Sequence, residues 1–415
     1  MILLYIDPGT GSMLFSLMTG ILSVIWFGAQ KLYMKTKYFS RGRIKVDENK
    51  IPLVIYSDDK RYWQVFEPIC HELNERKFDV TYLTASADDP ALECPYPYLH
   101  AEYIGSGNKQ FFRMNFVNAY IVLSTTPGLD VYQWKRSKMA DFYVHILHGI
   151  SVTGYSFFGV DFYDAIILSA QFQKEEVREL EKKRGSRQKE IRLAGVPYWD
   201  EMKKKITTSD KFPEHQTTVL LAPSWREMGL LNRYGSRLID ILLSTGYHII
   251  VRPHPQSFTS EKAMLDRLMS LYPDSEQLEW NRDADNFNVL RRADIMISDY
   301  SSVIFDFAFV HDKPVICTHI EWKDTVYDLE WLDDKPGGKS WTQRTLPSIG
   351  MILTDDNLPE LKLMIDQSLN SQDVRSMRQQ IRDEVWTCKG NGASNVASYL
   401  IDKYDGLKNT KQDVR

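Results

Sequence analysis

A cluster of hydroxyl and carboxyl side chains follows a predicted strand in residues 294–306, DIMISDYSSVIFD. The apolar run 293–298 is typical of a buried strand, and a helix is predicted to begin near Ser302. Asp299 and Ser301 then lie in the turn, where the first helical N–H groups lack intrahelical partners and attract anions. A nucleophilic serine would need the glycines of a G-x-S-x-G elbow, which this turn lacks. We therefore favour a phosphate site over a nucleophile, with a plain N-cap as the structural alternative.

Two other apolar strands also end in cationic residues. The run LLAPSWRE ends with Ser224 and Arg226, and an arginine at that place can hold a phosphate through two hydrogen bonds. The run IIVRPHPQS ends with Arg252 and His254, which are two residues apart and so share one face of an extended chain. Prolines on both sides of His254 stiffen this segment. A cation and an imidazole on one face favour an anionic ligand, whereas Arg226 taken alone could equally be a surface arginine.

A fourth predicted strand, 143–149, ends with His148 and Gly149. Histidine is a natural general base because its pKa lies near neutrality. Glycine lets a ligand approach the backbone closely. This pair therefore predicts a site for proton transfer at the end of the strand.

Metal chemistry is not predicted. His145 and His148 are three residues apart, so on a strand they point to opposite faces. The paired acids Asp58-Asp59 and Asp88-Asp89 are interpreted as turn residues, since no D-x-D motif follows a predicted strand. The four cysteines are far apart without C-x-x-C spacing, which argues against a zinc site and a disulfide framework. No cofactor is expected.

The elements that position these residues form two successive α/β runs. A Lys-rich stretch at 201–216 separates them. Near-continuous apolar runs indicate strands buried on both faces of a parallel sheet. Two Rossmann-like domains facing a cleft are therefore expected, with the ligand near the carboxyl ends of the strands. Strands are predicted at 52–57, 79–84, 119–125, 143–149, 164–170, 217–224, 247–254, 293–299 and 313–318, and helices at 61–76, 171–184, 234–245, 260–271, 286–292, 302–310, 371–386 and 394–405.

The N-terminal segment differs from the rest of the chain. No residue from Pro8 to Gln30 is charged, and six lysines and arginines follow between Lys31 and Lys45. A signal peptide has its positive charge before the apolar run, so a short transmembrane or interfacial helix is the better interpretation. The basic flank predicts a location on the cytoplasmic face of the cell membrane. The expected domains are 1–45 (membrane anchor helix and basic flank), 46–205 (N-terminal Rossmann-like domain) and 206–415 (C-terminal Rossmann-like domain with the C-terminal helices).

Overall charge excludes one class of partner. The net charge is -4, so nucleic acid is not an expected ligand. The sequence makes no prediction of the oligomeric state.

The motifs together resemble a known family. They are His148-Gly149, GVPYWDEM (195–202), APSWRE (222–227), RPHP (252–255) and SDYSSVIFDFAFVHDKPVI (298–316). In this order they are similar to those of the CDP-glycerol glycerophosphotransferases, which assemble teichoic acids and related glycerol-phosphate polymers. The likeness covers roughly residues 140–320. The sequence departs from the family's usual pattern at Leu147, at Ile150-Ser151 and at Tyr198, all on the acceptor side.

The resemblance implies a GT-B-like enzyme on the membrane, in which a hydroxyl of a lipid-linked acceptor attacks the β-phosphorus of CDP-glycerol, or a similar CDP-polyol, and expels CMP. His148 would be the base, and His254 would stabilise charge on the transferred phosphoryl group. The donor phosphates and nucleotide would be bound by Arg226, Arg252, Ser301, Ser302, Asp299 and Asp306, with Gly149 and Ser224 near the site.

Two other functions compete with this one. A GT-B glycosyltransferase could hold a nucleotide sugar in the same phosphate site. A non-catalytic membrane scaffold could keep the fold without binding any nucleotide.

Overall fold

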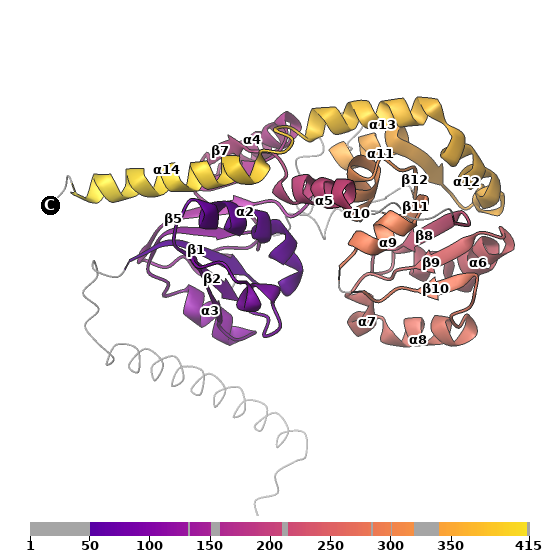
Figure 1. Ribbon diagram of the computed structural model, residues 1–415, viewed down its shortest axis with the longest axis horizontal. Helices are drawn as coiled ribbons and strands as arrows, with labels where there is room; N and C mark the ends of the chain where they lie inside the picture. The colour runs from indigo at the N-terminus through magenta and orange to yellow at the C-terminus, as the bar shows by residue number, and fades with distance from the viewer. Residues whose placement is uncertain are drawn as a thin grey trace, which may run out of the picture. The chain divides into compact units, whose positions relative to one another are not determined.

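The computed structural model describes residues 50–131, 133–150, 158–209, 215–283, 285–299, 301–318 and 340–412. Residues 51–415 form one compact unit (Figure 1). The expected N-terminal helix lies outside the described residues. In the part of the chain that is described, no helix has the length and apolar character needed to cross a membrane.

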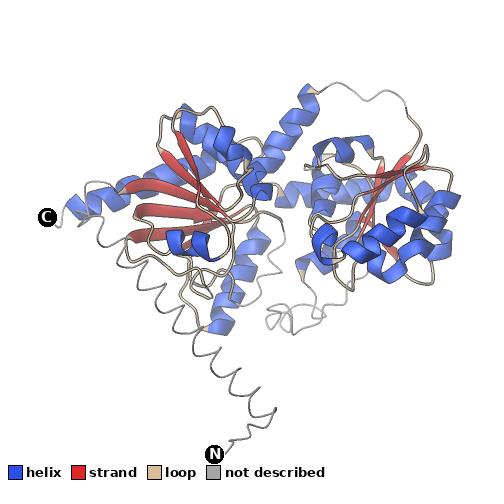
Figure 2. Cartoon of the chain, turned by 90° about the horizontal axis from the view of Figure 1, so that it is seen from below, coloured by secondary structure: helices blue, strands red, loops and turns tan. Residues whose placement is uncertain are grey.

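The first half of the unit is a seven-stranded parallel sheet with the order β3-β2-β1-β4-β5-β6-β7. Figure 2 shows strands in red with helices in blue around them. Its strands are β1 (Ile51–Ser57), β2 (Val80–Thr84), β3 (Leu99–Tyr103), β4 (Ala119–Ser124), β5 (Ala140–Ile146), β6 (Ala165–Leu168) and β7 (Glu190–Leu193). Its helices are η1 (Lys60–Tyr62), α2 (Trp63–Glu75), η2 (Pro90–Glu93), α3 (Asn108–Met114), α4 (Gln171–Arg184) and α5 (Pro197–Thr208).

The second half is a six-stranded parallel sheet with the order β10-β9-β8-β11-β12-β13. Its strands are β8 (Thr218–Ala222), β9 (His248–Val251), β10 (Leu278–Trp280), β11 (Ile295–Ser298), β12 (Val315–Thr318) and β13 (Gly350–Leu353). Its helices are α6 (Leu230–Ser244), α7 (Ser257–Ser260), α8 (Lys262–Leu271), α9 (Phe287–Arg292), α10 (Val303–Phe305), η3 (Asp306–Val310), α11 (Trp341–Ile349), η6 (Leu358–Glu360), α12 (Leu361–Asn370) and α13 (Gln372–Val385). The prediction of two parallel α/β sheets is confirmed.

The last helix, α14 (Gly392–Gln412), returns to the first half and packs on α2 and β4 (Figure 1). The ring of Tyr404 contacts Phe78 and Tyr120, with centroids 5.4 and 5.2 Å apart. The Arg76 guanidinium donates to the hydroxyls of Ser394 and Ser398. The first strand, β1, and the last helix, α14, of the described residues therefore belong to the same half.

The Lys-rich stretch at 201–216 was expected to separate the two domains, but its first part belongs to helix α5. It buries Tyr198, Trp199 and Met202, and the expected domain boundary at 205/206 falls inside it. The Trp199 indole is fully buried and contacts Phe309 of the second half, with centroids 5.8 Å apart. Because the lysines of this segment leave one apolar helical face intact, α5 packs as an amphipathic helix.

Candidate active site at the strand ends

Each sheet winds outward in both directions from one pair of central strands, β1 and β4 in the first sheet and β8 and β11 in the second. Ligands of open α/β sheets bind outside the carboxyl ends of such strands, where the winding reverses. The described residues that follow these four strands are Asp58 to Arg61, Thr125, Ser224 to Arg226, and Asp299 with Ser301 and Ser302.

His148 lies in a loop rather than on its predicted strand, because β5 ends at Ile146. Its Nδ1 is 2.8 Å from Thr125 Oγ1, and its ring packs on Tyr62 with centroids 4.8 Å apart. Part of the residue is exposed to solvent, but the pKa of the ring is lowered to about 4, chiefly because the surrounding protein displaces water; Thr125 opposes this shift and Arg61 adds to it. The tautomer that donates from Nδ1 to Thr125 leaves Nε2 unprotonated, so Nε2 can accept a proton.

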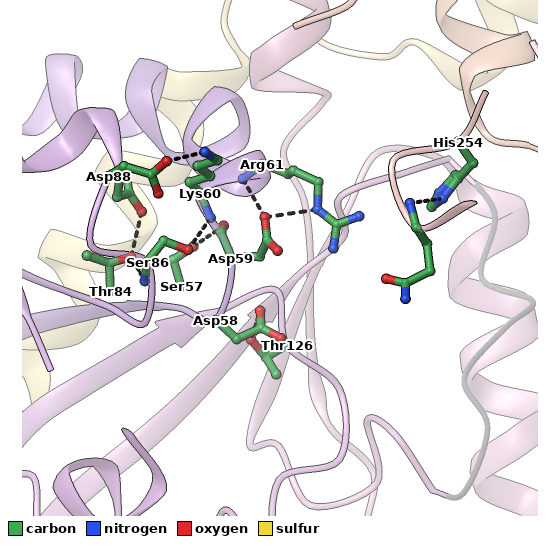
Figure 3. A network of polar contacts seen from close by, with 12 residues as sticks. Ser57, Asp58, Asp59, Lys60, Arg61, Thr84, Ser86, Asp88, Thr126 and His254 are labelled. Carbon is green, nitrogen blue, oxygen red and sulfur yellow. Dashed lines mark hydrogen bonds and ion pairs between the residues drawn. The ribbon is translucent and has the colours of Figure 1, made fainter. Parts of the chain in front are cut away.

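Arg61 extends from the turn after β1 toward the loop that carries His254 (Figure 3). Asp59 Oδ1 accepts hydrogen bonds from both the backbone N–H and Nε of Arg61, each 2.9 Å long. The positive charge of Arg61 lowers the pKa of His148 and of His254. One cation therefore acts on both histidines.

The tautomer of His254 is set by a backbone group. Its Nδ1 accepts a hydrogen bond of 3.1 Å from the backbone N–H of Gln256, so in the neutral ring the proton is on Nε2. Burial lowers its pKa to about 4; Arg61 lowers it further, and Glu261 raises it. The ring is therefore neutral at physiological pH and presents an Nε2–H donor.

The backbone around Arg226 is held in an uncommon conformation. Its φ is 77°, in the left-handed region that residues with a Cβ rarely adopt. Its N–H donates to Glu261 Oε1 over 2.7 Å, and Asn232 Nδ2 donates to both Arg226 O and Glu261 Oε1. The guanidinium lies 4.1 Å from the centroid of the Trp225 ring, which in turn stacks on His254. Arg226 and His254 therefore both lie against the Trp225 indole.

Arg252 is half-buried at the end of β9. Its Nη1 donates to Oδ1 of Asn281, the residue after β10, and burial lowers its pKa while Asp283 and Asp285 raise it. Part of the guanidinium is thus committed to the protein, and the rest can serve an anion.

The structure corrects the expectation for Asp299. Its side chain is fully buried and accepts hydrogen bonds from the backbone N–H groups of Ser224 (3.0 and 2.9 Å) and Leu230 (3.0 Å). A carboxylate used in this way holds the loop that carries Arg226, and it does not face a phosphate. Ser224 is buried in the same loop.

Ser301 and Ser302 do not cap the helix that follows. Ser302 is the N-cap residue of α10, but its hydroxyl accepts no capping hydrogen bond, and α10 has only three residues before the π-helical turn η3. A Cβ added to Gly149 would lie 3.6 Å from Ser302 Oγ, so the His148-Gly149 loop and this turn are adjacent. Of the two roles expected for these serines, the donor role fits the structure and the capping role does not.

Asp306 is the second correction. Its carboxylate is buried, and Oδ1 accepts hydrogen bonds of 2.6 Å from Tyr198 Oη and from Trp199 Nε1. Burial raises its pKa to about 6, although both hydrogen bonds oppose this shift. The side chain links α5 to η3 inside the protein and does not bind the nucleotide directly.

Sequence reasoning missed Arg61, Tyr62 and Thr125. All three follow apolar strands, as the recognised motifs do, but Asp58-Asp59 was interpreted as a turn. Asp59 does act as the side-chain cap of η1, whereas Asp58 accepts a hydrogen bond of 2.7 Å from Thr126 Oγ1. The sequence signal that could have identified Arg61 was therefore an apolar strand followed by a positively charged residue. Within the described residues, no group of three or more His, Cys, Asp or Glu side chains could hold a metal ion.

The fold first defines a class: α/β proteins with two parallel sheets whose polar side chains gather where the strands end. The similar solved structures belong to this class. A wall teichoic acid polymerase, TagF, in a structure with CDPG has a TM-score of 0.59 at 15% identity, covering 92% of this chain and 97% of that chain. A putative UDP-N-acetylglucosamine 2-epimerase from Listeria monocytogenes has a TM-score of 0.53 at 16% identity, covering 86% and 98%. At these identities the likeness concerns the fold alone.

Within this class, residues 159–340 match the family described as CDP-Glycerol:Poly(glycerophosphate) glycerophosphotransferase. The minor teichoic acid biosynthesis protein GgaB of Bacillus subtilis (strain 168) is 26% identical over 224 residues, covering 47% of this chain and 23% of that protein. The chain thus spans about a quarter of this relative's length. These matches confirm the resemblance to the glycerophosphotransferases that the strand-end motifs predict. The matched residues include Arg226, His254 and Ser302 but not His148 or Arg61.

Proposed function

We propose that this protein transfers glycerol phosphate, or a related polyol phosphate, from a CDP-polyol to a hydroxyl of a growing envelope polymer. One observation carries the proposal: two histidines whose pKa values are lowered by burial follow the ends of β5 and β9. Nδ1 of His148 is held by Thr125, and Nδ1 of His254 accepts from a backbone N–H. One ring can take a proton, and the other can donate one in a hydrogen bond.

In the proposed reaction the acceptor oxygen attacks the β-phosphorus of the donor. Nε2 of His148 removes the hydroxyl proton as the new P–O bond forms. The P–O bond to the CMP moiety breaks, and CMP leaves with the bonding electron pair. Nε2–H of His254 hydrogen-bonds a non-bridging oxygen, and Arg226, Arg252 and the hydroxyls of Ser301 and Ser302 bind the donor phosphates.

The site of action that fits this chemistry is the cytoplasmic face of the cell membrane, in a GT-B-like arrangement with the ligand between the two halves. Support for the membrane comes from the uncharged segment between Pro8 and Gln30 and the basic flank from Lys31 to Lys45. A lipid-linked acceptor would be reached from that surface. Full-length protein should sediment with membranes, and a variant lacking residues 1–45 should not. Equal sedimentation of both proteins would remove the anchor from the proposal.

The transferase activity is tested with full-length protein, CDP-glycerol or CDP-ribitol, and a lipid-linked acceptor. CMP release that requires the acceptor is expected. In a thermal-shift panel, CDP and CMP should stabilise the protein more than UDP and UMP do. Absence of CMP with every CDP-polyol would overturn the proposal, and a preference for UDP would favour a glycosyltransferase instead. A protein that no nucleotide stabilises would be a scaffold.

A further inference from the structure

Arg61 is a fixed cation with unused hydrogen-bonding capacity. Its backbone N–H and Nε both donate to Asp59 Oδ1, and its side chain is 43% exposed. Among the described residues, neither terminal nitrogen of the guanidinium has a hydrogen-bond partner. An exposed ion pair of this kind contributes at most about 1 kcal/mol to stability. The contact with Asp59 therefore orients the Arg61 side chain but contributes little to the stability of the fold.

The fixed guanidinium is aimed at the site. It follows β1, one of the two strands at which the first sheet reverses its winding. It points toward the loop of His254 (Figure 3), and its charge reaches the rings of both histidines. The Gly149 loop is adjacent to Ser302, so the loop of His148 and the Ser302 hydroxyl lie side by side.

Neighbouring charges on this turn are directed elsewhere. The Lys60 ammonium pairs with Asp88, which is 71% exposed on the far side of the turn. The Asp58 carboxyl accepts from Thr126, and burial raises its pKa. The Asp59 carboxylate is paired with Arg61 itself through the backbone N–H and Nε. Of the groups on this turn, the terminal nitrogens of Arg61 are therefore the donors directed toward the loop of His254 (Figure 3).

We propose that Arg61 donates hydrogen bonds from its terminal nitrogens to the non-bridging oxygens of the phosphoryl group in transfer. It would act from the first half of the protein, whereas Arg226 and Arg252 act from the second. The inference rests on the proposed function. Compared with the bound donor, new charge develops on the departing CMP in the transition state and is spread over the equatorial phosphoryl oxygens, so a cation placed here raises kcat more than it tightens ground-state binding.

The test compares Arg61→Gln with Lys60→Gln in the full-length protein. Both variants remove one positive charge from the same turn, but only Arg61 faces the histidines. Arg61→Gln should lower kcat for CMP release at least about 100-fold, the size found when one transition-state donor is removed. Its affinity for CMP, which lacks the transferred phosphoryl group, should stay within about twofold of wild type, and Lys60→Gln should stay near wild type in both measurements.

Chemical rescue separates contact with the substrate from a structural role. Guanidinium chloride at millimolar concentration should restore CMP release by Arg61→Ala at least about tenfold, because a free guanidinium can occupy the vacated space. Turnover of Arg61→Gln within about threefold of wild type would overturn the inference. So would a large loss that guanidinium does not rescue and that is accompanied by loss of CMP binding.

Anion binding distinguishes failure of the inference about Arg61 from failure of the proposed function. If wild type releases no CMP from any CDP-polyol, its thermal stabilisation by inorganic pyrophosphate is compared with that of both variants. Loss of stabilisation in Arg61→Gln alone would retain Arg61 as a phosphate contact of another reaction. Equal stabilisation of all three proteins would overturn the inference as well.

Discussion

The two halves of the protein hold their strand-end side chains by different means. In the second half two of the contacts run to backbone groups: Asp299 binds the N–H of Ser224 and Leu230, and His254 accepts from the N–H of Gln256. In the first half the contact that holds His148 runs between side chains, since Thr125 after β4 holds His148 after β5. The contact of His254 is built within one continuous motif, whereas those of Asp299 and His148 join the ends of different strands and exist only after the strands are ordered in the sheet.

The largest loss of activity is expected when the proposed general base, His148 of the first half, is removed. His148→Ala is expected to lower CMP release about 10³-fold, because the acceptor proton then has no positioned base. Thr125→Val keeps the ring but removes its positioning contact, so a loss of roughly tenfold is expected. Equal activity of His148→Ala and wild type would transfer the proton-accepting role to another group.

The backbone contacts of the second half are tested at Asp299. Asp299→Ala leaves two buried N–H groups without an acceptor, so a loss of about 2–4 kcal/mol in the free energy of unfolding is expected. Activity should fall as well, since the loop of Arg226 loses its support. Urea unfolding measures the first effect, with Asp266→Ala on the surface of α8 as the control. A stable Asp299→Ala protein that lost only CDP affinity would restore the original prediction of direct phosphate contact.

Ser302 separates phosphate binding from helix capping. Ser302→Ala should lower CMP release about tenfold through one lost hydrogen bond and change stability by less than about 0.5 kcal/mol. Ser340 is a matched control, because it caps α11 by accepting from Gln343 N–H. Ser340→Ala should lose about 1 kcal/mol of stability and keep its activity. The opposite pattern would make Ser302 the cap and not the ligand.

The two lowered histidine pKa values predict an unusual pH profile. A base with the ordinary pKa of 6.5 would lose about 25-fold in activity between pH 7 and pH 5. With a pKa of about 4 for His148, kcat/KM should change by less than twofold over this range and fall only near pH 4. Removal of the Arg61 charge should move the acid limb to higher pH. An acid limb near pH 6.5 in wild type would contradict the proposed environment of the ring.

The same shifts affect stability with a definite sign. The unfolded histidines bind protons below about pH 6.5, whereas the folded ones do so only near pH 4. The unfolded state therefore holds more protons between these values, and the free energy of unfolding should fall as the pH drops from 6.5 to 4. Circular dichroism during urea titration measures this dependence.

The smallest effect on activity is expected at Asp306. Asp306→Asn keeps an oxygen that can accept from Tyr198 and Trp199, so nucleotide affinity should be unchanged. The folded pKa of about 6 exceeds that of the unfolded aspartate, so its charge costs stability above pH 6. The variant should therefore gain about 1–2 kcal/mol over wild type between pH 5 and pH 8. Loss of CDP affinity without loss of stability would return Asp306 to the nucleotide site.

Strand prediction succeeded in the middle of each sheet and failed at the edges. The missed strands are β3, β7, β10 and β13, which are the four edge strands. Central strands such as β8 are buried along their whole length and appear as continuous apolar runs. Edge strands such as β3 (LHAEY) and β7 (EIRL) keep polar residues on exposed faces, so their sequences resemble loops.

The sequence by itself determined that apolar strands are followed closely by His148, Arg226, Arg252 and His254, because buried strands and the polar residues after them are local features. It also carried the motifs by which the family is matched. Tertiary structure alone decided that β1 lies beside β4, which brings Arg61 and Thr125 to the site, and that Asp299 and Asp306 turn inward. Strand order and side-chain direction depend on contacts between residues far apart in the chain, and no local pattern encodes them.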